Sequence, residues 1–328
     1  MNPAKLIICM TPLQALIARH LIRRRPHESF DLLMLCYKEA DNAKFHHYFQ
    51  AAAAHCRRAR YVLIPPQKWR RELAMPRLLD GLDKHYCSIF AASIDNPHVQ
   101  YPLNKLAFDT LETFDDGSGN LIPSSILYHN SRNPQRRLFN FLRRIRLQTE
   151  ELRRLSCRHH TLYPGLPNIA APTVPLDLWQ SADGFRQPEN PAGSSQTIRI
   201  LLGQPTFADA AANITLADTL LRRFDIGRYF PHPREHYRVA GADYIDSPLI
   251  FEDYLLQELA AQPENRFEIY HLASSAALNV HAFPRTRITA VCPALPPFDG
   301  ENYRTLYRLM AQMGMEIAEL PAESIKAA

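Results

Sequence analysis

The sequence predicts an α/β protein of two domains, each with a parallel sheet covered by helices. Short apolar strands alternate with helical patterns as far as residue 114, and the alternation starts again at residue 197. Between the two series lies a stretch rich in proline and glycine, which is typical of a connection between domains. We therefore expect an N-terminal domain at 1–163, a connection at 164–196 and a C-terminal domain at 197–328.

The composition fits a globular protein. Of 328 residues, 46% are hydrophobic and 22% are charged, and the formal net charge is +5. No run of about 18 apolar residues is present to span a membrane. The apolar stretch after Met1 is too short for a signal peptide and leads into a helical pattern, so we expect a cytoplasmic protein. The cysteines form no C-x-x-C pair and are expected to be reduced.

The first domain is expected to hold five strands joined by helices. Thr11 suits the N-cap of the first helix and Pro12 suits its first position, so this helix begins directly after the first strand. Apolar residues then recur at helical spacing. The expected strands cover residues 6–9, 30–36, 61–64, 88–92 and 110–114, and further helices cover 43–56 and 69–82.

The second domain repeats the pattern. In a parallel sheet, ligands bind beyond the carboxyl ends of the strands, so polar residues in the loops after strands are the candidate site residues. The expected strands cover 198–202, 227–230, 267–271 and 288–292, and the helices cover 209–223, 252–260 and 303–313.

A histidine between two prolines follows a strand of the second domain. Pro231 and Pro233 stiffen the backbone and keep His232 out of a helix. Arg234 adds a fixed positive charge that suits a phosphate or carboxylate. A titratable imidazole beside such a charge suits the cleavage of a phosphate ester or glycosyl-phosphate bond. The alternative is a surface turn whose histidine caps a backbone group.

The loop after the strand at 110–114 is acidic and glycine-rich. It contains Asp115, Asp116, Gly117, Gly119 and Asn120 at the carboxyl end of a strand, which makes it a candidate site. An ordinary polar turn is the first alternative, because Asp-Gly is common turn chemistry. A metal site is the second, but two adjacent aspartates without a matched third ligand do not predict a metal.

Two further loops carry small hydroxyl residues at expected helix starts. Ser247 and Pro248 precede one helix, and Ser274 and Ser275 begin another after a strand. Backbone amides at such a position can bind a phosphate. Simple capping of the helix is the alternative.

Residues 133–160 are strongly basic. The arginines alternate with apolar residues in a pattern typical of an amphipathic helix, which can rest on an anionic membrane surface. A solvated helix face is the alternative. Nucleic acid is not an expected partner, because neither an aromatic platform nor a recognised fold motif accompanies the charge. The arginines are Arg136, Arg137, Arg143, Arg144, Arg146, Arg153, Arg154 and Arg158.

Several stretches, in this order, extend over nearly the whole chain: 11–14, 44–49, 114–122, 199–203, 231–234, 247–254, 266–270 and 275–278. Together they resemble the bacterial lipooligosaccharide sialyltransferases of glycosyltransferase family 52. The resemblance implies the GT-B architecture, in which two Rossmann-like domains with parallel sheets face a central cleft. The N-terminal domain would then take the acceptor and the C-terminal domain the CMP-sugar.

The resemblance also implies an activity. Family members transfer sialic acid from CMP-sialic acid to a terminal galactose, with inversion and without a metal or other cofactor. We therefore expect an α-2,3-sialyltransferase acting on lipooligosaccharide. A homodimer is a further expectation, since exchanged-segment dimers occur in the family. The family's amino-terminal anchor is not found in this sequence, so peripheral attachment to the inner membrane through Arg136–Arg158 is also expected.

The resemblance assigns roles to individual residues. His232 resembles the family's general acid. The family's base is an aspartate just beyond the strand at 199–203; Thr206 stands there in this chain, and Asp209 is the nearest carboxylate. Asp115 and Asp116 are the alternative base, because a similar acidic motif provides the base in other bacterial sialyltransferase families. Expected substrate contacts are Gly203, Gln204, Pro205, Pro231, Pro233, Arg234, Ser247, Pro248, Ser274, Ser275, Gly117, Gly119, Asn120, Thr11 and Gln14.

Two other functions fit the same motifs. A related hexosyltransferase would use another sugar nucleotide. A non-catalytic protein that binds glycans or nucleotides would keep the fold without the chemistry, and Thr206 at the usual position of the base favours this alternative.

Overall fold

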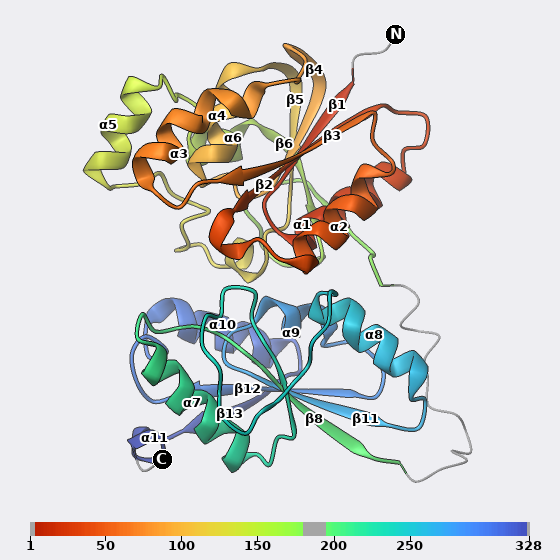
Figure 1. Cartoon of the computed structure of the whole chain (residues 1–328), viewed down its shortest axis with the longest axis vertical. Coiled ribbons are helices and arrows are strands. Elements are labelled where there is room, and N and C mark those ends of the chain that lie inside the picture. Colours follow the sequence, from red (N-terminus) through yellow and green to blue (C-terminus); the bar gives the residue numbers. More distant parts are fainter. Residues whose placement is uncertain (1–3, 180–194, 327–328) are drawn as a thin grey trace. The chain divides into compact units, whose positions relative to one another are not determined.

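The computed structural model describes residues 4–179 and 195–326. By its internal contacts the chain divides into two units, Met1–Leu178 and Trp179–Ala328. Each unit contains one sheet flanked by helices (Figure 1). Of the expected connection at 164–196, residues 164–178 belong to the first unit, and residues 180–194 lie outside the described residues.

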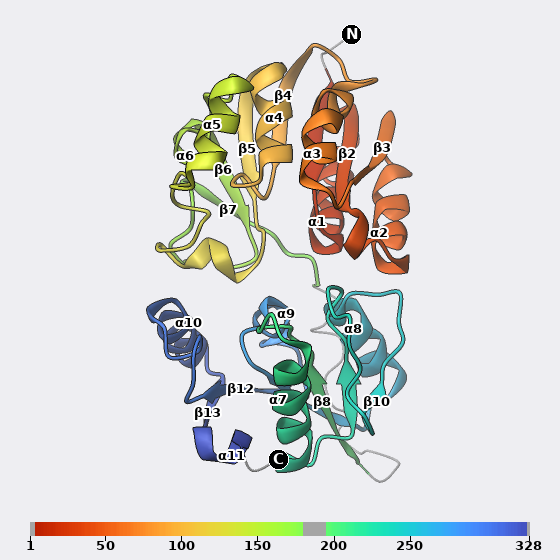
Figure 2. The same cartoon turned by 60° about the vertical axis from the view of Figure 1, so that its left-hand side comes forward.

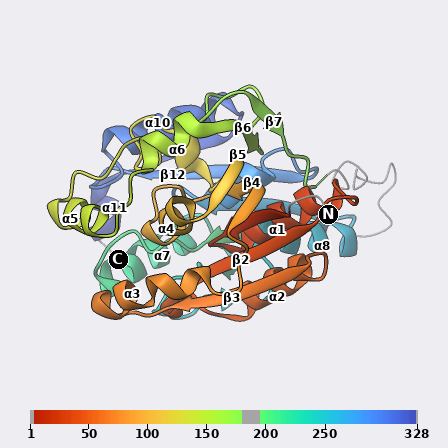
Figure 3. The same ribbon diagram turned by 90° about the horizontal axis from the view of Figure 1, so that it is seen from above.

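The sheet of the first unit is parallel throughout, with the order β3-β2-β1-β4-β5-β6-β7 (Figure 3). The chain runs outward from β1 to β3 and then returns to β4 on the other side of β1. The carboxyl ends of β1 and β4 therefore form the topological switch point, where ligands bind in such sheets. The strands are β1 (Lys5–Cys9), β2 (Phe30–Tyr37), β3 (Arg58–Ile64), β4 (His85–Ala91), β5 (Ala107–Phe114), β6 (Ser156–Thr161) and β7 (Thr173–Pro175).

Helices cover both faces of this sheet. Figure 1 shows the first two helices on one face and the next four on the other. The first helix begins as predicted, because Thr11 accepts a hydrogen bond from the backbone N–H of Gln14 at 3.3 Å and Pro12 takes the first position. The helices are α1 (Pro12–Arg23), α2 (Ala43–Ala53), α3 (Lys68–Ala74), α4 (Pro97–Lys105), α5 (Pro134–Leu142) and α6 (Thr149–Leu155), with short 3-10 turns at Lys38–Ala40, Met75–Leu79 and Ser118–Leu121.

The second unit has a parallel sheet with the order β10-β9-β8-β11-β12-β13. Its switch point lies between β8 and β11. Two helix pairs are in contact, α8 with α9 and α7 with α11 (Figure 2). The elements are β8 (Thr197–Leu202), α7 (Ala210–Arg223), β9 (Arg228–Phe230), β10 (Asp243–Tyr244), α8 (Phe251–Ala261), β11 (Arg266–His271), α9 (Ser275–Val280), β12 (Thr286–Pro293), α10 (Glu301–Gln312), β13 (Glu316–Leu320) and α11 (Ala322–Lys326).

The strands expected from sequence are all present, and their apolar runs are buried. Leu6, Ile7, Ile8 and Cys9 of β1 are each 0% exposed, as a central strand with helices on both faces requires. The two-domain α/β fold predicted from the sequence is therefore confirmed. Among the described residues, no helix is both long enough and apolar enough to cross a membrane.

The expectation of one amphipathic helix over the basic stretch at 133–160 is wrong. Asn133 caps α5, which ends after Leu142, and Arg144 then adopts a left-handed backbone with φ of 55°. Gln148 and Glu151 form a capping box that starts α6. The stretch ends in β6, so its arginines are spread over two short helices, a turn and a strand.

Candidate active site

Gln14 organises the switch point of the first unit. The capped start of α1 places this side chain beside the loop after β4, and it is 0% exposed. Its Oε1 accepts a hydrogen bond from the backbone N–H of Met10 at 2.6 Å. Its Nε2 donates to Ser93 Oγ at 2.9 Å and to Asp116 Oδ1. Gln14 thus joins the loops that follow β1, β4 and β5.

Asp116 is a carboxyl group held at this switch point. Ser93 Oγ donates to its Oδ2 at 2.8 Å, in addition to the hydrogen bond from Gln14. Burial raises the pKa of Asp116 to about 7, with the hydrogen bond from Ser93 opposing the shift and the negative charge of Asp95 adding to it. A carboxylate with a pKa near neutrality is suited to accept a proton as a general base.

The neighbouring Asp115 has a different environment. It is 0% exposed and accepts hydrogen bonds from His159 Nε2 at 2.9 Å and Thr161 Oγ1 at 2.9 Å. The backbone N–H of Leu162 donates to it at 2.5 Å and Asn168 Nδ2 at 3.3 Å. These partners come from β6 and the loop after it, so Asp115 fixes the end of β5 against its neighbour.

The loop after Asp116 is held by glycines and an amide. Gly117 has φ of 109°, a conformation that favours glycine. A Cβ on Gly119 would lie 3.2 Å from Leu127 Cδ1, so this position is also crowded. Asn120 is buried, and its Oδ1 accepts the backbone N–H of Asp116 at 3.1 Å. The motif therefore supports the backbone that carries Asp116.

His232 follows β9 in the second unit. Its Nδ1 accepts a hydrogen bond from the backbone N–H of Arg234 at 3.1 Å, which leaves the proton of the neutral ring on Nε2. Burial and the positive charge of Arg234 lower the pKa of His232 to about 4. The ring is therefore neutral near pH 7, and an anion bound beside it would raise its pKa again.

Glu235 holds the segment of His232 in place and was not singled out from the sequence. Its Oε2 accepts hydrogen bonds from Tyr229 OH at 2.9 Å and from the backbone N–H of His232 at 3.4 Å. Tyr244 OH donates to Oε1 at 3.3 Å. A Cβ on Gly203 would lie 2.5 Å from Glu235 Oε2, so the end of β8 must be glycine for this cluster to pack. Burial raises the pKa of Glu235.

Gln204 closes the switch point of the second unit. Its Oε1 accepts the backbone N–H of Ala273 at 2.9 Å, which connects the loop after β8, including Pro205, to the loop after β11. Ser274 is at the N-cap position of α9, and its N–H donates to His271 Nδ1 at 3.1 Å. Ser275 is the first residue of α9.

The remaining predicted residues lie outside these two clusters. Asp209 is exposed and caps α7, accepting the backbone N–H groups of Ala211 and Ala212 at 3.2 and 3.3 Å. Ser247 Oγ accepts the N–H of Leu249 at 3.2 Å in the loop before α8 that also contains Pro248.

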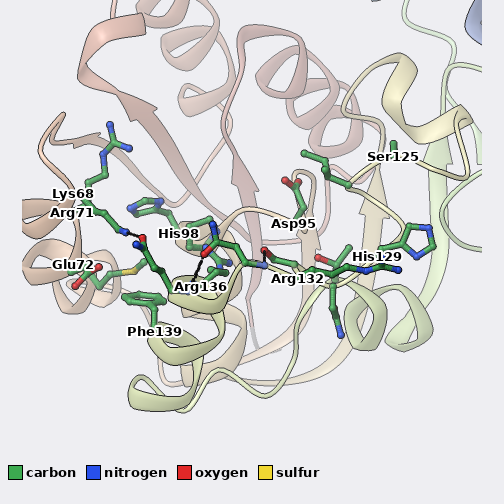
Figure 4. Close-up of a pocket in the computed structure, with 18 of the residues that line it drawn as sticks. Lys68, Arg71, Glu72, Asp95, His98, Ser125, His129, Arg132, Arg136 and Phe139 are labelled. Atoms are coloured by element: carbon green, nitrogen blue, oxygen red, sulfur yellow. Dashed lines mark hydrogen bonds between the residues drawn. The ribbon is translucent and has the colours of Figure 1, made fainter. Parts of the chain in front are cut away.

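A large pocket in the first unit was not predicted. It has a volume of about 850 Å³ and is lined by residues of α3, α4 and α5, by the end of β2 and by the loop after β5. Figure 4 shows Lys68, Arg71 and Glu72 at one end, His98, Arg136 and Asp95 nearer the middle, and Ser125 and His129 at the other end. Because these residues come from distant segments, no single motif in the sequence indicated the pocket.

The fold and the polar groups at both switch points define a glycosyltransferase of the two-domain GT-B class. One solved structure, that of the glycotransferase of kitacinnamycin, aligns over 98% of this chain and 87% of its own, with a TM-score of 0.51 and 10% identity. The family model for glycosyltransferase family 52 matches residues 27–295. The chain belongs to glycosyltransferase family 52, as the sequence motifs indicated.

Curated relatives match over most of their lengths. The CMP-N-acetylneuraminate:beta-galactoside alpha-2,3-sialyltransferase of Pasteurella multocida (strain Pm70) is 35% identical over 327 residues, covering 96% of this chain and 99% of that protein. The N-acetyllactosaminide alpha-2,3-sialyltransferase of Haemophilus influenzae (strain ATCC 51907 / DSM 11121 / KW20 / Rd) is 29% identical over 298 residues, covering 89% and 93%.

Proposed function

We propose that this enzyme transfers sialic acid from CMP-sialic acid to the 3-hydroxyl of a terminal galactose. The acceptor is a β-galactoside at the end of a lipooligosaccharide. The observation that carries the reaction is Asp116, a carboxyl with a pKa of about 7 at a switch point of the sheet. The donor and the linkage are supported by the name of the Pasteurella multocida relative.

In this mechanism, Asp116 accepts the proton of the galactose hydroxyl. The hydroxyl oxygen forms a bond to the anomeric carbon of sialic acid while the bond from that carbon to the phosphate oxygen breaks. Attack from the side opposite CMP inverts the anomeric centre. Gln14 and Ser93 position the carboxyl of Asp116 through their hydrogen bonds.

His232 is the proposed general acid. Its free ring is neutral, and the negative charge of the donor phosphate raises the pKa of the imidazole once the donor is bound. The second proton binds Nδ1, which releases the hydrogen bond from the Arg234 N–H, and the protonated ring then passes its Nε2 proton to the departing phosphate of CMP. Because the leaving group is a monophosphate and not a diphosphate, the proposed reaction needs no divalent metal clamp.

Asp116 fits the role of base better than Asp209 does. Both oxygens of Asp209 accept backbone N–H groups at the start of α7, and its side chain is exposed to solvent. The carboxylate of Asp209 is thus used to cap the helix. The carboxylate oxygens of Asp115 likewise accept hydrogen bonds, from donors in β6 and the following loop.

A second part of the proposal concerns attachment to the anionic inner membrane. Leu138, Phe141 and Leu142 of α5 are 60%, 79% and 69% exposed. Arg144 and Arg146, in the turn that follows, are also exposed. A short helix with exposed apolar side chains beside arginines suits the interface of an anionic membrane.

The identity of the donor separates this function from a hexosyltransferase. We expect CMP to raise the melting temperature of the protein and UDP at the same concentration to leave it unchanged, because a ligand of the folded state stabilises it. Protection by UDP alone would assign another sugar nucleotide. If CMP protects the protein but CMP-sialic acid is neither hydrolysed nor transferred, the protein is a nucleotide-binding protein without this catalytic activity.

A further inference from the structure

The pocket of the first unit is positively charged. Lys68, Arg71, Arg132 and Arg136 line it together with two carboxylates, Glu72 and Asp95, and Arg71 also pairs with Glu39 at 3.2 Å. His98 is neutral near pH 7, because burial, with help from Arg71 and Arg136, lowers its pKa to about 4. The excess of cations favours an anionic ligand.

Arg136 is the most enclosed of these cations. Burial lowers its pKa, and the negative charge of Asp95 only partly offsets this effect. Its Nη2 donates to Gln100 Oε1 at 2.7 Å, a neutral acceptor. Arg136 takes part in none of the ion pairs found among the described residues. A partly buried guanidinium without an anionic partner is suited to bind the anion of a ligand bidentately.

His98 adds an unused polar atom to the pocket wall. It is 4% exposed and packs edge-on against Tyr37. Asn96 Nδ2 donates to Tyr37 OH at 3.0 Å, which fixes the orientation of the Asn96 amide. Its Oδ1 lies 3.2 Å from His98 Nδ1 and accepts a hydrogen bond from it, so the ring proton of His98 is on Nδ1. His98 Nε2 is then an acceptor, and it has no hydrogen-bond partner among the described residues. Buried polar atoms are normally paired, so this atom indicates a place for a ligand hydroxyl or water.

The pocket adjoins the proposed base. Asp95 belongs to the pocket wall and lies two residues beyond Ser93, which donates to Asp116 Oδ2 at 2.8 Å. The volume of about 850 Å³ lies in the upper part of the range for small-molecule sites, about 300–1,000 Å³. This leaves room for more of an acceptor than its terminal galactose.

We propose that this pocket binds the portion of the acceptor beyond galactose and selects anionic glycosides, that is, saccharides carrying a phosphate or carboxylate. This inference rests on the proposed transfer to a glycan. Arg136 and Lys68 pair with the anion, and Phe139 contacts the apolar face of a sugar ring. The neutral end of the acceptor, its galactose, lies toward Asp116.

Titration calorimetry of the full chain without donor tests this directly. The ligands are lactose, a lactoside with a phosphate on its aglycone, the same lactoside with a carboxylate, and inorganic phosphate. We expect at least one charged lactoside to bind about tenfold or more tightly than lactose, as a charge-assisted hydrogen bond provides. The stronger of the two charged ligands identifies the anion.

Three variants assign the effect to the pocket. In each of the variants Arg136→Gln and Lys68→Gln, the affinity for the charged lactoside should fall toward the affinity for lactose, so that their ratio approaches one. Arg137→Gln is the matched control: it removes an arginine from the next position of α5, on the exposed side, and should keep the ratio. If Arg136→Gln lowers the melting temperature strongly, the result for Lys68→Gln alone decides whether the pocket causes the preference for the charged ligand.

Equal affinities for lactose and both charged lactosides would overturn the inference. So would an equal loss in Arg137→Gln, which would indicate general surface charge. If inorganic phosphate binds as tightly as the phosphate-bearing lactoside and does not compete with it, the protein has a separate site for the free anion, and the inference is wrong. Because these measurements need no turnover, a failure of sialyl transfer is detected separately, by the absence of product from CMP-sialic acid.

Discussion

At the scale of single residues, two adjacent carboxylates have different chemistry because their partners differ. Asp115 accepts hydrogen bonds from β6 and the following loop, and it is fully buried. Asp116 is held by Gln14 and Ser93, which leaves a carboxyl whose pKa is about 7. The sequence predicted this pair as a site, but only the fold separates the positioning residue from the proposed base.

The pKa of Asp116 can be measured. ¹³C NMR of labelled aspartate carboxyls should show one group that titrates near pH 7 and is absent in Asp116→Asn. Ser93 donates to the ionised carboxylate and so stabilises the charged form. Ser93→Ala should therefore raise the pKa further, by about one unit or more. Ser88→Ala in β4 is the control, because Ser88 Oγ has no partner among the described residues. A pKa that Ser93→Ala leaves unchanged would contradict the role given to this hydroxyl.

His232 is the second residue that decides the chemistry. His232→Ala should lower kcat by about 10²–10⁴-fold, the usual contribution of general acid catalysis, while CMP binding survives. His236→Ala removes an exposed histidine four positions away and should keep the parent rate. Steady-state kinetics with CMP-sialic acid measures both variants. Parent-like turnover by His232→Ala would exclude it as the acid.

At the scale of elements, apolar runs predicted strands well, and polar strands were missed. The sequence of β6, Ser-Cys-Arg-His-His-Thr, has no apolar run, yet His159 and His160 are buried. Their partners, Asp115 at 2.9 Å and Glu112 at 2.7 Å, come from β5 and its carboxyl end, so the pairing becomes visible only in the folded sheet. Helix α4 was missed for a related reason, since Pro102 lies inside it.

Helix α5 leads to a prediction at the same scale. Leu138, Phe141 and Leu142 changed together to Ser should weaken binding to anionic vesicles, because the variant loses apolar area that the lipid would bury. Arg144 and Arg146 changed to Gln should weaken binding by about 1 kcal/mol per charge. Vesicle sedimentation measures both variants, and transfer to soluble lactose should remain near the parent rate.

Arg222 and Arg223 of α7 provide the charge-matched control. Changing both to Gln removes two positive charges from the other unit and should leave vesicle binding unchanged. If the α5 variants sediment with vesicles as well as the parent does, α5 is an ordinary solvated helix.

At the scale of the whole molecule, each unit has its own parallel sheet and its own proposed catalytic residue. Asp116 lies at the switch point of the first sheet, and His232 follows β9 in the second. The order of strands and helices along the chain predicted this two-unit fold, and both residues were among the candidates taken from strand-end loops. The pocket was not predictable, because Lys68, His98 and Arg136 are brought together only by the packing of α3, α4 and α5.

The proposed mechanism predicts that activity survives metal removal. Treatment with EDTA should leave the rate of transfer unchanged, since a single phosphate departs and His232 provides the proton. Product formation before and after chelation is the measurement, with added Mg²⁺ or Mn²⁺ as the comparison. Loss of activity that either ion restores would require a metal in the reaction and a new role for the acidic loop.

The central claim is the transfer of sialic acid with Asp116 as the base, and mass spectrometry of lactose incubated with CMP-sialic acid and the purified protein tests it most directly. We predict a product heavier than lactose by one sialic acid residue, formed by the parent and by Asp209→Asn. Asp116→Asn should form it at a rate at least about 10²-fold lower. No sialylated product from the parent protein, or parent-like yield from Asp116→Asn, would contradict this account.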